Sequence, residues 1–314
     1  MRWTLVGHRD GWADRESDGS GYDGHMIASM PNRPASESEI FAAGLLSGKV
    51  ALVTGGGTGL GKATALELAR CGAKVLVAGR RAEVLEQAVA EIGPTADWIA
   101  GDIRERGEAE RIVASTLERA GRLDVLVNNA GGQYFTPAEG IAAKGWRAVW
   151  RLNVEGTLNM AEAAFAQAMS PAGGGTIVNV TLSPHHGMPG MAHSGAARAA
   201  VEELTRELVH RWAGEGIAVT AVAAGHFDTE ALEKYPESLR AGMARTVPLQ
   251  RLGAVEEHAW LVALLASPLG RAFNGSTVTL DGARDNWFGP WPPPGLADAS
   301  GEVPTEERKG ARAG

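Results

Sequence analysis

The amino-acid sequence predicts a single α/β domain, doubly wound, with a mostly parallel seven-stranded sheet. Short Val-rich apolar runs alternate with helical stretches from Lys49 onward. Such alternation is typical of a parallel sheet that carries helices on both faces. The apolar runs are continuous, as in Val75-Leu76-Val77-Ala78, which fits strands buried on both sides.

The order of strands and helices follows from these runs and from the helical periods between them. Strands are expected at Val50–Thr54, Lys74–Ala78, Ala96–Ala100, Val125–Asn128, Thr176–Val180, Ala218–Ala223 and Ser276–Leu280. Helices are expected at Leu60–Arg70, Arg81–Glu91, Glu105–Ala120, Gly145–Ala168, Ser194–Trp212 and Val255–Ala266.

The two ends of the chain differ from its middle. Residues 1–44 are polar and Gly-rich and lack a strand or helix period, so we expect an extension there. The folded domain is expected over residues 45–289, followed by a Pro-rich, flexible tail at 290–314. Trp287, Phe288 and Trp291 are expected to cover a ligand site or a neighbouring subunit, because large apolar side chains seek burial; a solvated tail is the alternative.

Composition limits the partners of this chain. Its 314 residues, 44% of them hydrophobic, suffice for one buried core. The net charge of −7, without a basic stripe, argues against nucleic acid, and the sequence shows neither a signal peptide nor a membrane helix. The one cysteine, Cys71, excludes an intramolecular disulfide, predicts a reducing cytoplasm and is expected in the core. No metal site is predicted.

A Gly-rich turn follows the first predicted strand and opens the first predicted helix. In Thr54-Gly55-Gly56-Gly57-Thr58-Gly59-Leu60-Gly61, three glycines have the spacing G-x-x-x-G-x-G. Such a turn lets backbone approach a pyrophosphate closely and offers helix N-terminal N–H groups to its charge. A flexible turn is the alternative, but the place between strand and helix favours a dinucleotide site. The residues expected to bind the cofactor here are Gly55, Thr58, Gly59, Leu60 and Gly61.

The end of the second predicted strand indicates which dinucleotide is bound. A carboxylate there would hold the ribose hydroxyls and repel a 2′-phosphate, but the sequence reads Ala78-Gly79-Arg80-Arg81. Arg80 is placed to bind that phosphate through hydrogen bonds of about 1.5–3 kcal/mol each, so NADP(H) is the expected cofactor. Two solvated arginines are the alternative. Asp102, with Ile103 beside it, would either contact the adenine or cap the next helix.

The fourth predicted strand ends at Asn128-Asn129-Ala130-Gly131, where ligands of open sheets bind. Together with T-G-G-G-T-G-L-G and the order of elements, this motif resembles the short-chain dehydrogenase/reductase family over nearly all of residues 47–289. The resemblance implies a Rossmann fold and a small-molecule substrate. It also implies cofactor contacts from Asn129, Ala130 and Gly131, and from Gly225 after the sixth strand.

The resemblance extends to two helices. It matches Asn153 to the Asn of the family's catalytic helix. It also implies a homodimer or homotetramer built on the helices Gly145–Ala168 and Ser194–Trp212.

The chain departs from the family where catalysis is expected. The usual Tyr-x-x-x-Lys is replaced by Ser194 and Arg198, and the usual catalytic Ser falls near Thr181, Leu182 or Ser183. Arg198 keeps its charge and is expected to hold the nicotinamide ribose. A serine hydroxyl cannot replace a phenol as proton donor, and loss of a general acid costs about 10²–10⁴ in rate. Reduction of an unactivated ketone by the family's usual route is therefore not expected.

Conjugate reduction of an enoyl thioester needs a different kind of catalytic group. Hydride addition to the β-carbon places negative charge on the thioester oxygen, which hydrogen-bond donors can stabilise. The expected donors are Ser194, His193 and Thr181. The α-carbon would then take a proton from water or from an acid, for which the candidates are His185, His186 and Tyr134. For each of these three residues, taken one at a time, the alternative is a purely structural position in a polar loop or at an exposed rim.

Two stretches sharpen the resemblance. Gly131–Glu139 with Lys144-Gly145-Trp146, and His193–Ala199, resemble the peroxisomal trans-2-enoyl-CoA reductases and equally bacterial citronellol or citronellal dehydrogenases. The 2,4-dienoyl-CoA reductases also have Ser at the Tyr position, but they keep the Lys and supply a Tyr near the position of Ser183. We expect an NADPH-dependent reductase of trans-2-enoyl acyl-CoA. A terpenoid-type alcohol or aldehyde dehydrogenase, and a silent NADP(H)-binding regulator or scaffold, are the alternatives.

Overall fold

A seven-stranded sheet is the framework of the structure, a computed structural model that describes residues 37–183, 185–186, 190–234, 240 and 242–287. The strand order is β3-β2-β1-β4-β5-β6-β7, and every pair of neighbours is parallel. The strands are β1 Val50–Thr54, β2 Lys74–Gly79, β3 Ala96–Ala100, β4 Val125–Asn128, β5 Gly175–Leu182, β6 Ile217–Ala224 and β7 Thr277–Leu280. The predicted fold class is confirmed.

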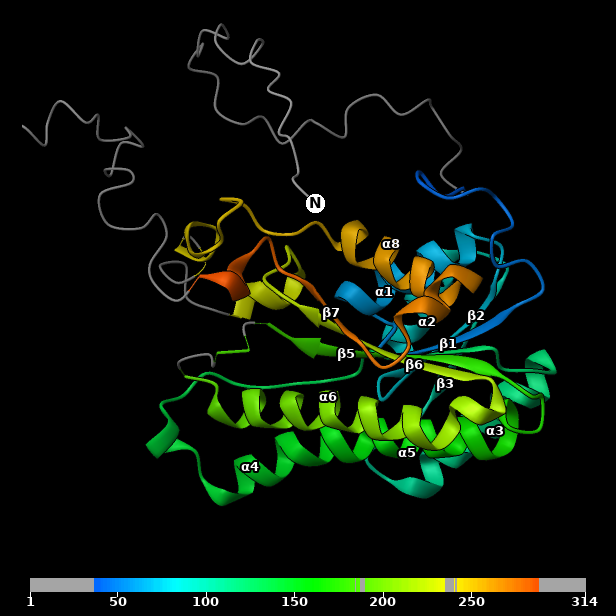
Figure 1. Cartoon of the computed structure of the whole chain (residues 1–314), viewed down its shortest axis with the longest axis horizontal. Coiled ribbons are helices and arrows are strands. Elements are labelled where there is room, and N and C mark those ends of the chain that lie inside the picture. Colours follow the sequence, from blue (N-terminus) through cyan, green and yellow to red (C-terminus); the bar gives the residue numbers. More distant parts are fainter. Residues whose placement is uncertain (1–36, 184, 187–189, 235–239, 241, 288–314) are drawn as a thin grey trace, which may run out of the picture. The chain divides into compact units, whose positions relative to one another are not determined.

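Helices cover both faces of this sheet (Figure 1). One face carries α1 Gly59–Arg70, α2 Ala82–Ile92 and α8 Val255–Ala266. The other carries α3 Arg106–Ala120, α4 Ala143–Trp150, α5 Gly156–Ala164 and α6 Ala192–Trp212. Successive strand residues point to opposite faces, so Leu52 packs in one core and Val53 in the other. This two-sided burial explains why the strands read as continuous apolar runs.

The helix predicted at Gly145–Ala168 is a continuous helical run from Ala143 to Met169. It contains two π-turns, η2 at Arg151–Glu155 and η3 at Phe165–Met169. In η2 the side-chain Nδ2 of Asn153 donates to the carbonyl of Val149 at 2.7 Å. That carbonyl is the acceptor that a regular helix would give to the Asn153 N–H, so the side chain competes with the backbone and favours a wider turn.

The other predicted elements begin and end within two residues of the observed bounds, as expected for fraying ends. The difference that matters lies in β5, which continues two residues beyond the predicted Val180. Its last residue, Leu182, pairs with Ala224 of β6. The extension brings Thr181 to the carboxyl edge of the sheet. None of the helices in the described part of the chain is long and apolar enough to cross a membrane.

Cys71 is fully buried in the core between the sheet and α1, as predicted. Burial, with a contribution from the nearby Glu67 carboxylate, raises the pKa of its thiol to about 12. Glu67 accepts a hydrogen bond from the buried hydroxyl of Ser38, which fastens the segment before β1 to α1. The thiol therefore stays protonated at neutral pH and serves packing.

We expect Leu126→Ala to lower the free energy of unfolding by about 2–5 kcal/mol, because it opens a cavity beneath β4. Leu126 is fully buried in the core, whereas Leu269 is 70% exposed. Leu269→Ala is the matched control and should change stability by less than about 0.5 kcal/mol. Urea unfolding of both variants measures the difference. Equal losses in the two variants would contradict this description of the core.

Candidate active site

A cavity of about 830 Å³ opens at the carboxyl edge of the sheet. Its walls come from the ends of β1, β2, β4, β5 and β6 and from the segments that follow them. The chain order reverses at β1, since β2 lies on one side of it and β4 on the other. Ligands of doubly wound sheets bind at such a switch point. The cavity is therefore the candidate site for a dinucleotide.

The Gly-rich turn forms one wall of this cavity and leaves no room for side chains. Gly55 and Gly59 have φ of 65° and 51°, in the left-handed region. A Cβ on Gly61 would lie 2.4 Å from the carbonyl oxygen of Gly55. Thr58, the N-cap of α1, makes no side-chain cap bond, so the first-turn N–H groups remain available to an anion. With Leu60, all the turn residues predicted to bind the cofactor line the cavity.

Thr54 joins the two strands that meet at the switch point. Its fully buried hydroxyl accepts hydrogen bonds from the N–H groups of Asn129 at 3.1 Å and Ala130 at 3.0 Å, and donates to the carbonyl of Val127 at 3.3 Å. The Asn129 side chain donates to the carbonyls of Thr54 and Gly55, at 3.0 and 3.3 Å. The turn after β1 and the loop after β4 are thereby held as one unit.

The end of β2 places two cations at the cavity wall, since Arg80 and Arg81 both line it. Asp102 lines the same region, next to the buried Ile103. Hydrogen bonds from Arg104, at 2.9 Å from Nε, hold the pKa of the Asp102 carboxyl below its usual range, and the charge of Arg80 contributes. The side chain of Asp102 does not cap α3; both of its oxygens accept hydrogen bonds from Arg104, and the expected contact with the adenine stays a prediction.

Arg198 and Asn153 meet at the loop after β4. The Nη1 of Arg198 donates to the carbonyl of Val180 at 2.8 Å. Asn153 forms two hydrogen bonds with the backbone of Gly132, from Nδ2 at 2.9 Å and to Oδ1 at 3.2 Å. A Cβ on Gly131 would lie 2.2 Å from Nη2 of Arg198 and 2.8 Å from Oδ1 of Asn153. Gly131 is thus the position at which both side chains can close against the backbone.

The Arg198 guanidinium is a half-buried cation at the cavity wall. Burial lowers its pKa to about 10, so it keeps its charge at neutral pH. In the described part of the chain no carboxylate forms an ion pair with it, and its Nε has no hydrogen-bond partner. A half-buried cation of this kind is stabilised by an electron-rich ligand in the cavity.

Ser194 and His193 lie behind the cavity and not in its wall. Both are buried, and neither the Ser194 hydroxyl nor the His193 ring has a hydrogen-bond partner among the described residues. The imidazole of His193 packs edge-on against Tyr134, with 4.5 Å between ring centroids, and against Trp146, at 6.1 Å. Burial lowers the pKa of His193, which favours the neutral ring. Tyr134 itself is half exposed outside the cavity lining.

The side chains at the end of β5 diverge. Thr181 lines the cavity and donates a hydrogen bond to Glu202 on α6 at 2.8 Å. The Ser183 hydroxyl instead donates to the carboxylate of Asp281, after β7. His185 and His186 lie outside the cavity lining and contact the segment that follows β7. Of the three expected donors, the structure brings only Thr181 to the cavity.

The polar residues that line the cavity and that the sequence did not single out include Thr229, His226 and Arg284. Thr229 lies beside Gly59, and His226 follows the predicted Gly225. Burial lowers the pKa of His226, to which the Arg284 charge contributes. A polar residue just after a parallel strand is the signal that would have pointed to Thr229 and His226. Trp287 is half-buried, while Phe288 and Trp291 lie outside the described residues.

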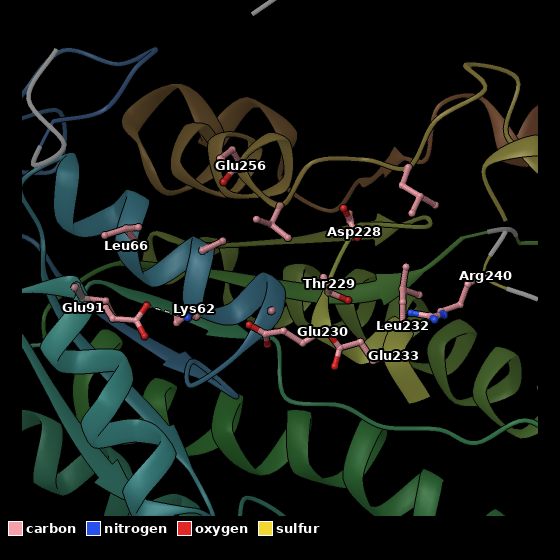
Figure 2. A pocket seen from close by; sticks show the side chains of 15 residues that line it. Lys62, Leu66, Glu91, Asp228, Thr229, Glu230, Leu232, Glu233, Arg240 and Glu256 are labelled. Carbon is pink, nitrogen blue, oxygen red and sulfur yellow. Dashed lines mark hydrogen bonds and ion pairs between the residues drawn. The ribbon is translucent and has the colours of Figure 1, made fainter. Parts of the chain in front are cut away.

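A second cavity, of about 620 Å³, lies beside the first and shares Gly59, Thr229 and Leu232 with it. Figure 2 shows its lining, in which Lys62 is bound to Glu91 at 2.9 Å. The remaining carboxylates of the wall are Asp228, Glu230, Glu233 and Glu256. Arg240 also lines this cavity, but the carboxylates outnumber the two cations and would disfavour phosphate groups. The arginine-lined first cavity is the better match for an anionic dinucleotide.

We expect Gly131→Ala to lower the free energy of unfolding by about 1–3 kcal/mol, because its Cβ overlaps the Arg198 guanidinium. The cost should fall by about 1 kcal/mol or more in an Arg198→Ala background, where that contact is gone. Gly107→Ala is the control: a Cβ there, in α3, meets nothing within 4 Å. Thermal unfolding of the four variants measures the coupling. Equal costs of Gly131→Ala in both backgrounds would refute the proposed contact.

Comparison with known proteins agrees with this geometry. The family model described as short chain dehydrogenase matches residues 49–240. A probable 2,4-dienoyl-CoA reductase of Bacillus subtilis, described as (2E)-enoyl-CoA-producing, is 38% identical over 78% of this chain and 98% of its own. A peroxisomal 2,4-dienoyl-CoA reductase of Arabidopsis thaliana, described as (3E)-enoyl-CoA-producing, is 32% identical over 77% of this chain and 86% of its own.

The solved structures give a similar picture. The citronellol catabolism dehydrogenase AtuB of Pseudomonas aeruginosa PAO1 is 40% identical, with a TM-score of 0.71 over 78% of this chain and 98% of its own. The family match spans the Gly-rich turn, the loop after β4 and the helix that carries Arg198. The chain therefore belongs to the short-chain dehydrogenase family and has the fold of an oxidoreductase of that family.

Proposed function

We propose that this chain is an NADP(H)-dependent reductase of α,β-unsaturated acyl thioesters, with a trans-2-enoyl acyl-CoA as substrate. The observation that carries the proposal is the pair at the start of α6, where Ser194 lies behind the cavity and the cationic Arg198 lies at its wall. Among the described residues that line the cavity, this arrangement offers positive charge to a substrate oxygen and no tyrosine as proton donor to a carbonyl. Relatives described as 2,4-dienoyl-CoA reductases support the substrate class.

The cavity residues fit the cofactor that the family binds. The Gly-rich turn and the open N-terminus of α1 would hold the pyrophosphate. Arg80 would hold a 2′-phosphate, with Asp102 and Ile103 beside the adenine. The residues assigned to the nicotinamide half are Asn129, Ala130, Gly131, Arg198, Gly225 and Thr229. When bound, the nicotinamide supplies a hydride.

Hydride addition to the β-carbon would leave negative charge on the thioester oxygen. A fixed positive charge of this chain, the guanidinium of Arg198, would stabilise it. The half-buried guanidinium of Arg198 acts in a low-dielectric wall, where a fixed donor is worth about 2.7–4 kcal/mol in the transition state. Its Nη1 is anchored on the carbonyl of Val180 at 2.8 Å, and the absence of a side chain on Gly131 leaves room for the guanidinium, which limits reorganisation during the reaction. Thr181, whose side chain carries a hydroxyl group, lines the same cavity.

A second candidate is a terpenoid-type alcohol or aldehyde dehydrogenase. The 40% identity to the citronellol catabolism dehydrogenase favours it. Such an enzyme would oxidise alcohols with NADP⁺ and would need a proton acceptor in the cavity. His226, whose ring is neutral because burial lowers its pKa, is the described group that suits this role.

The two candidates are separated by following NADPH consumption with a panel of trans-2-enoyl-CoAs, ketones and aldehydes, and NADP⁺ reduction with alcohols. We expect consumption with enoyl-CoAs and saturated acyl-CoA as product. Alcohol oxidation without enoyl-CoA reduction would support the second candidate. NADPH binding without turnover of any substrate would instead support a regulator or scaffold.

We expect NADPH to bind more tightly than NADH, and Arg80→Asp to invert this preference, because the carboxylate removes a phosphate partner and repels its charge. Loss of one charge-assisted hydrogen bond corresponds to about ten- to hundred-fold in affinity. Arg147→Asp makes the same charge change on an exposed part of α4 and should leave the preference intact. Fluorescence titration measures the dissociation constants of NADPH and NADH for each of the three proteins. Equal affinities of the unmodified chain for both cofactors would refute the assignment.

A further inference from the structure

A buried carboxylate lies beside the cavity and has no part in cofactor binding. Glu202 stands one helical turn after Arg198 on α6, and its side chain is 10% exposed. Its Oε1 accepts hydrogen bonds from the Thr181 hydroxyl at 2.8 Å and from Nε2 of His185 at 3.0 Å. Buried ionic groups are costly, and apolar replacements are often equally stable. The cluster is therefore better explained by a chemical task than by stability.

The imidazole of His185 lies between two carboxylates from distant parts of the chain. Its Nε2 faces Glu202, and its Nδ1 is hydrogen-bonded to the carboxylate of Asp285, a hundred residues further along the chain. The backbone N–H of His185 donates to the same Asp285 carboxylate at 2.6 Å. Each ring nitrogen thus faces an acidic side chain, an arrangement that favours the doubly protonated, cationic ring.

The groups around His185 favour this charged state. Burial alone would lower its pKa, but the Asp285 and Glu202 carboxylates outweigh burial and raise the pKa. His186 approaches the other oxygen of Asp285, with 3.5 Å between Nε2 and Oδ1. Asp281 accepts a hydrogen bond from the backbone N–H of Asp285 at 2.7 Å. The carboxylates of Glu202 and Asp285 thus face the histidines, and Asp281 holds the backbone of Asp285.

Thr181, Glu202 and His185 connect the cavity with the surface. Thr181 lines the cavity beside Arg198. Exposure of the side chains rises along the chain of hydrogen bonds, from 10% at Glu202 to 32% at His185. Both links have the length of ordinary hydrogen bonds. A proton taken up at the solvent-facing imidazole therefore has a continuous path to the cavity wall.

We propose that Thr181, Glu202 and His185 form a proton relay that delivers a proton from the surface to the substrate in the cavity. The proposal rests on the proposed function, because a reductase must add one proton for each hydride. An isolated hydroxyl such as that of Ser194 is too weak an acid for this task, whereas the Thr181 hydroxyl is refilled with a proton from His185 through Glu202, so that no free alkoxide is left.

The transfer balances in two steps. First, Nε2 of His185 gives its proton to Oε1 of Glu202, and the Thr181 hydroxyl turns from Glu202 towards the substrate. Then the electron pair of the enolate forms a C–H bond at the α-carbon with the Thr181 proton, the O–H bond of Thr181 breaks, and the Thr181 oxygen takes the proton from Oε1 of Glu202. His185 ends as neutral imidazole and regains its proton from solvent, while Glu202 and Thr181 return unchanged.

The test measures single-turnover reduction by the full chain, with NADPH and whichever panel substrate the unmodified protein reduces. Thr181→Val and Glu202→Gln keep the side-chain shape but cannot pass a proton. Each should lower the rate by about 10²-fold or more, the size of a general-acid effect, with NADPH affinity unchanged. Thr181→Ser should restore most of the rate. The control Glu203→Gln, on the exposed neighbour of Glu202, should leave the rate unchanged.

The pH profile separates a relay from a merely structural cluster. The rate should fall as pH rises through the raised pKa of His185, because only the imidazolium supplies a proton. His185→Gln should abolish this pH dependence. Glu202→Gln should shift it to lower pH, because a carboxylate that raises the pKa is gone. Unchanged rates and pH profiles in Thr181→Val and Glu202→Gln, with only lower thermal stability, would overturn the relay.

Failure of the relay is distinguishable from failure of the proposed substrate. If the unmodified protein reduces ketones or aldehydes but not enoyl thioesters, the substrate proposal fails, and the same variants still measure the relay on the carbonyl substrate. Rates that fall in the variants then support the relay, and unchanged rates overturn it. A protein that consumes NADPH with no member of the panel overturns both proposals.

Discussion

The buried hydroxyl of Thr54 is the contact on which the geometry of the cavity depends. It accepts hydrogen bonds from the backbone N–H groups of Asn129 and Ala130 in the loop after β4, and it donates a hydrogen bond to the carbonyl of Val127 in β4. The amide of Asn129 then fixes the Gly-rich turn from the other side. Because β1 and β4 are neighbours at the switch point, this small network positions both walls of the cavity at once. Loss of a buried partner there would leave backbone groups unsatisfied.

Helix α6 supplies two charged side chains next to this hydrogen-bond network. Arg198 closes on Gly131 at the cavity wall, and Glu202 lies one turn further along, bound to Thr181 and His185. The carboxylate is buried and the guanidinium is half-buried, although each would be more stable in water. We interpret them as the stabiliser of developing charge and as a step in proton supply.

The sequence predicted the sheet, the helices and the cofactor wall because each depends on local patterns. Continuous apolar runs, helical periods and the Gly-rich turn are readable over a few residues. The burial of Ser194 was not predictable, since it depends on the packing of α6 against distant segments. The partner of His185 lies a hundred residues away, after β7. The π-turn at Asn153 was also missed, because a side chain that competes for one carbonyl leaves the helical period intact.

The central claim is conjugate reduction without a phenolic acid, and isotope transfer tests it most directly. The measurement uses NADPH deuterated at the transferring position of the nicotinamide, a trans-2-enoyl-CoA and ordinary water, with the product analysed by mass spectrometry and NMR. The account predicts deuterium on the β-carbon of the saturated acyl-CoA and a solvent-derived hydrogen on the α-carbon. Deuterium on the carbinol carbon of an alcohol, formed from a ketone or aldehyde while enoyl-CoA stays unreacted, would contradict it.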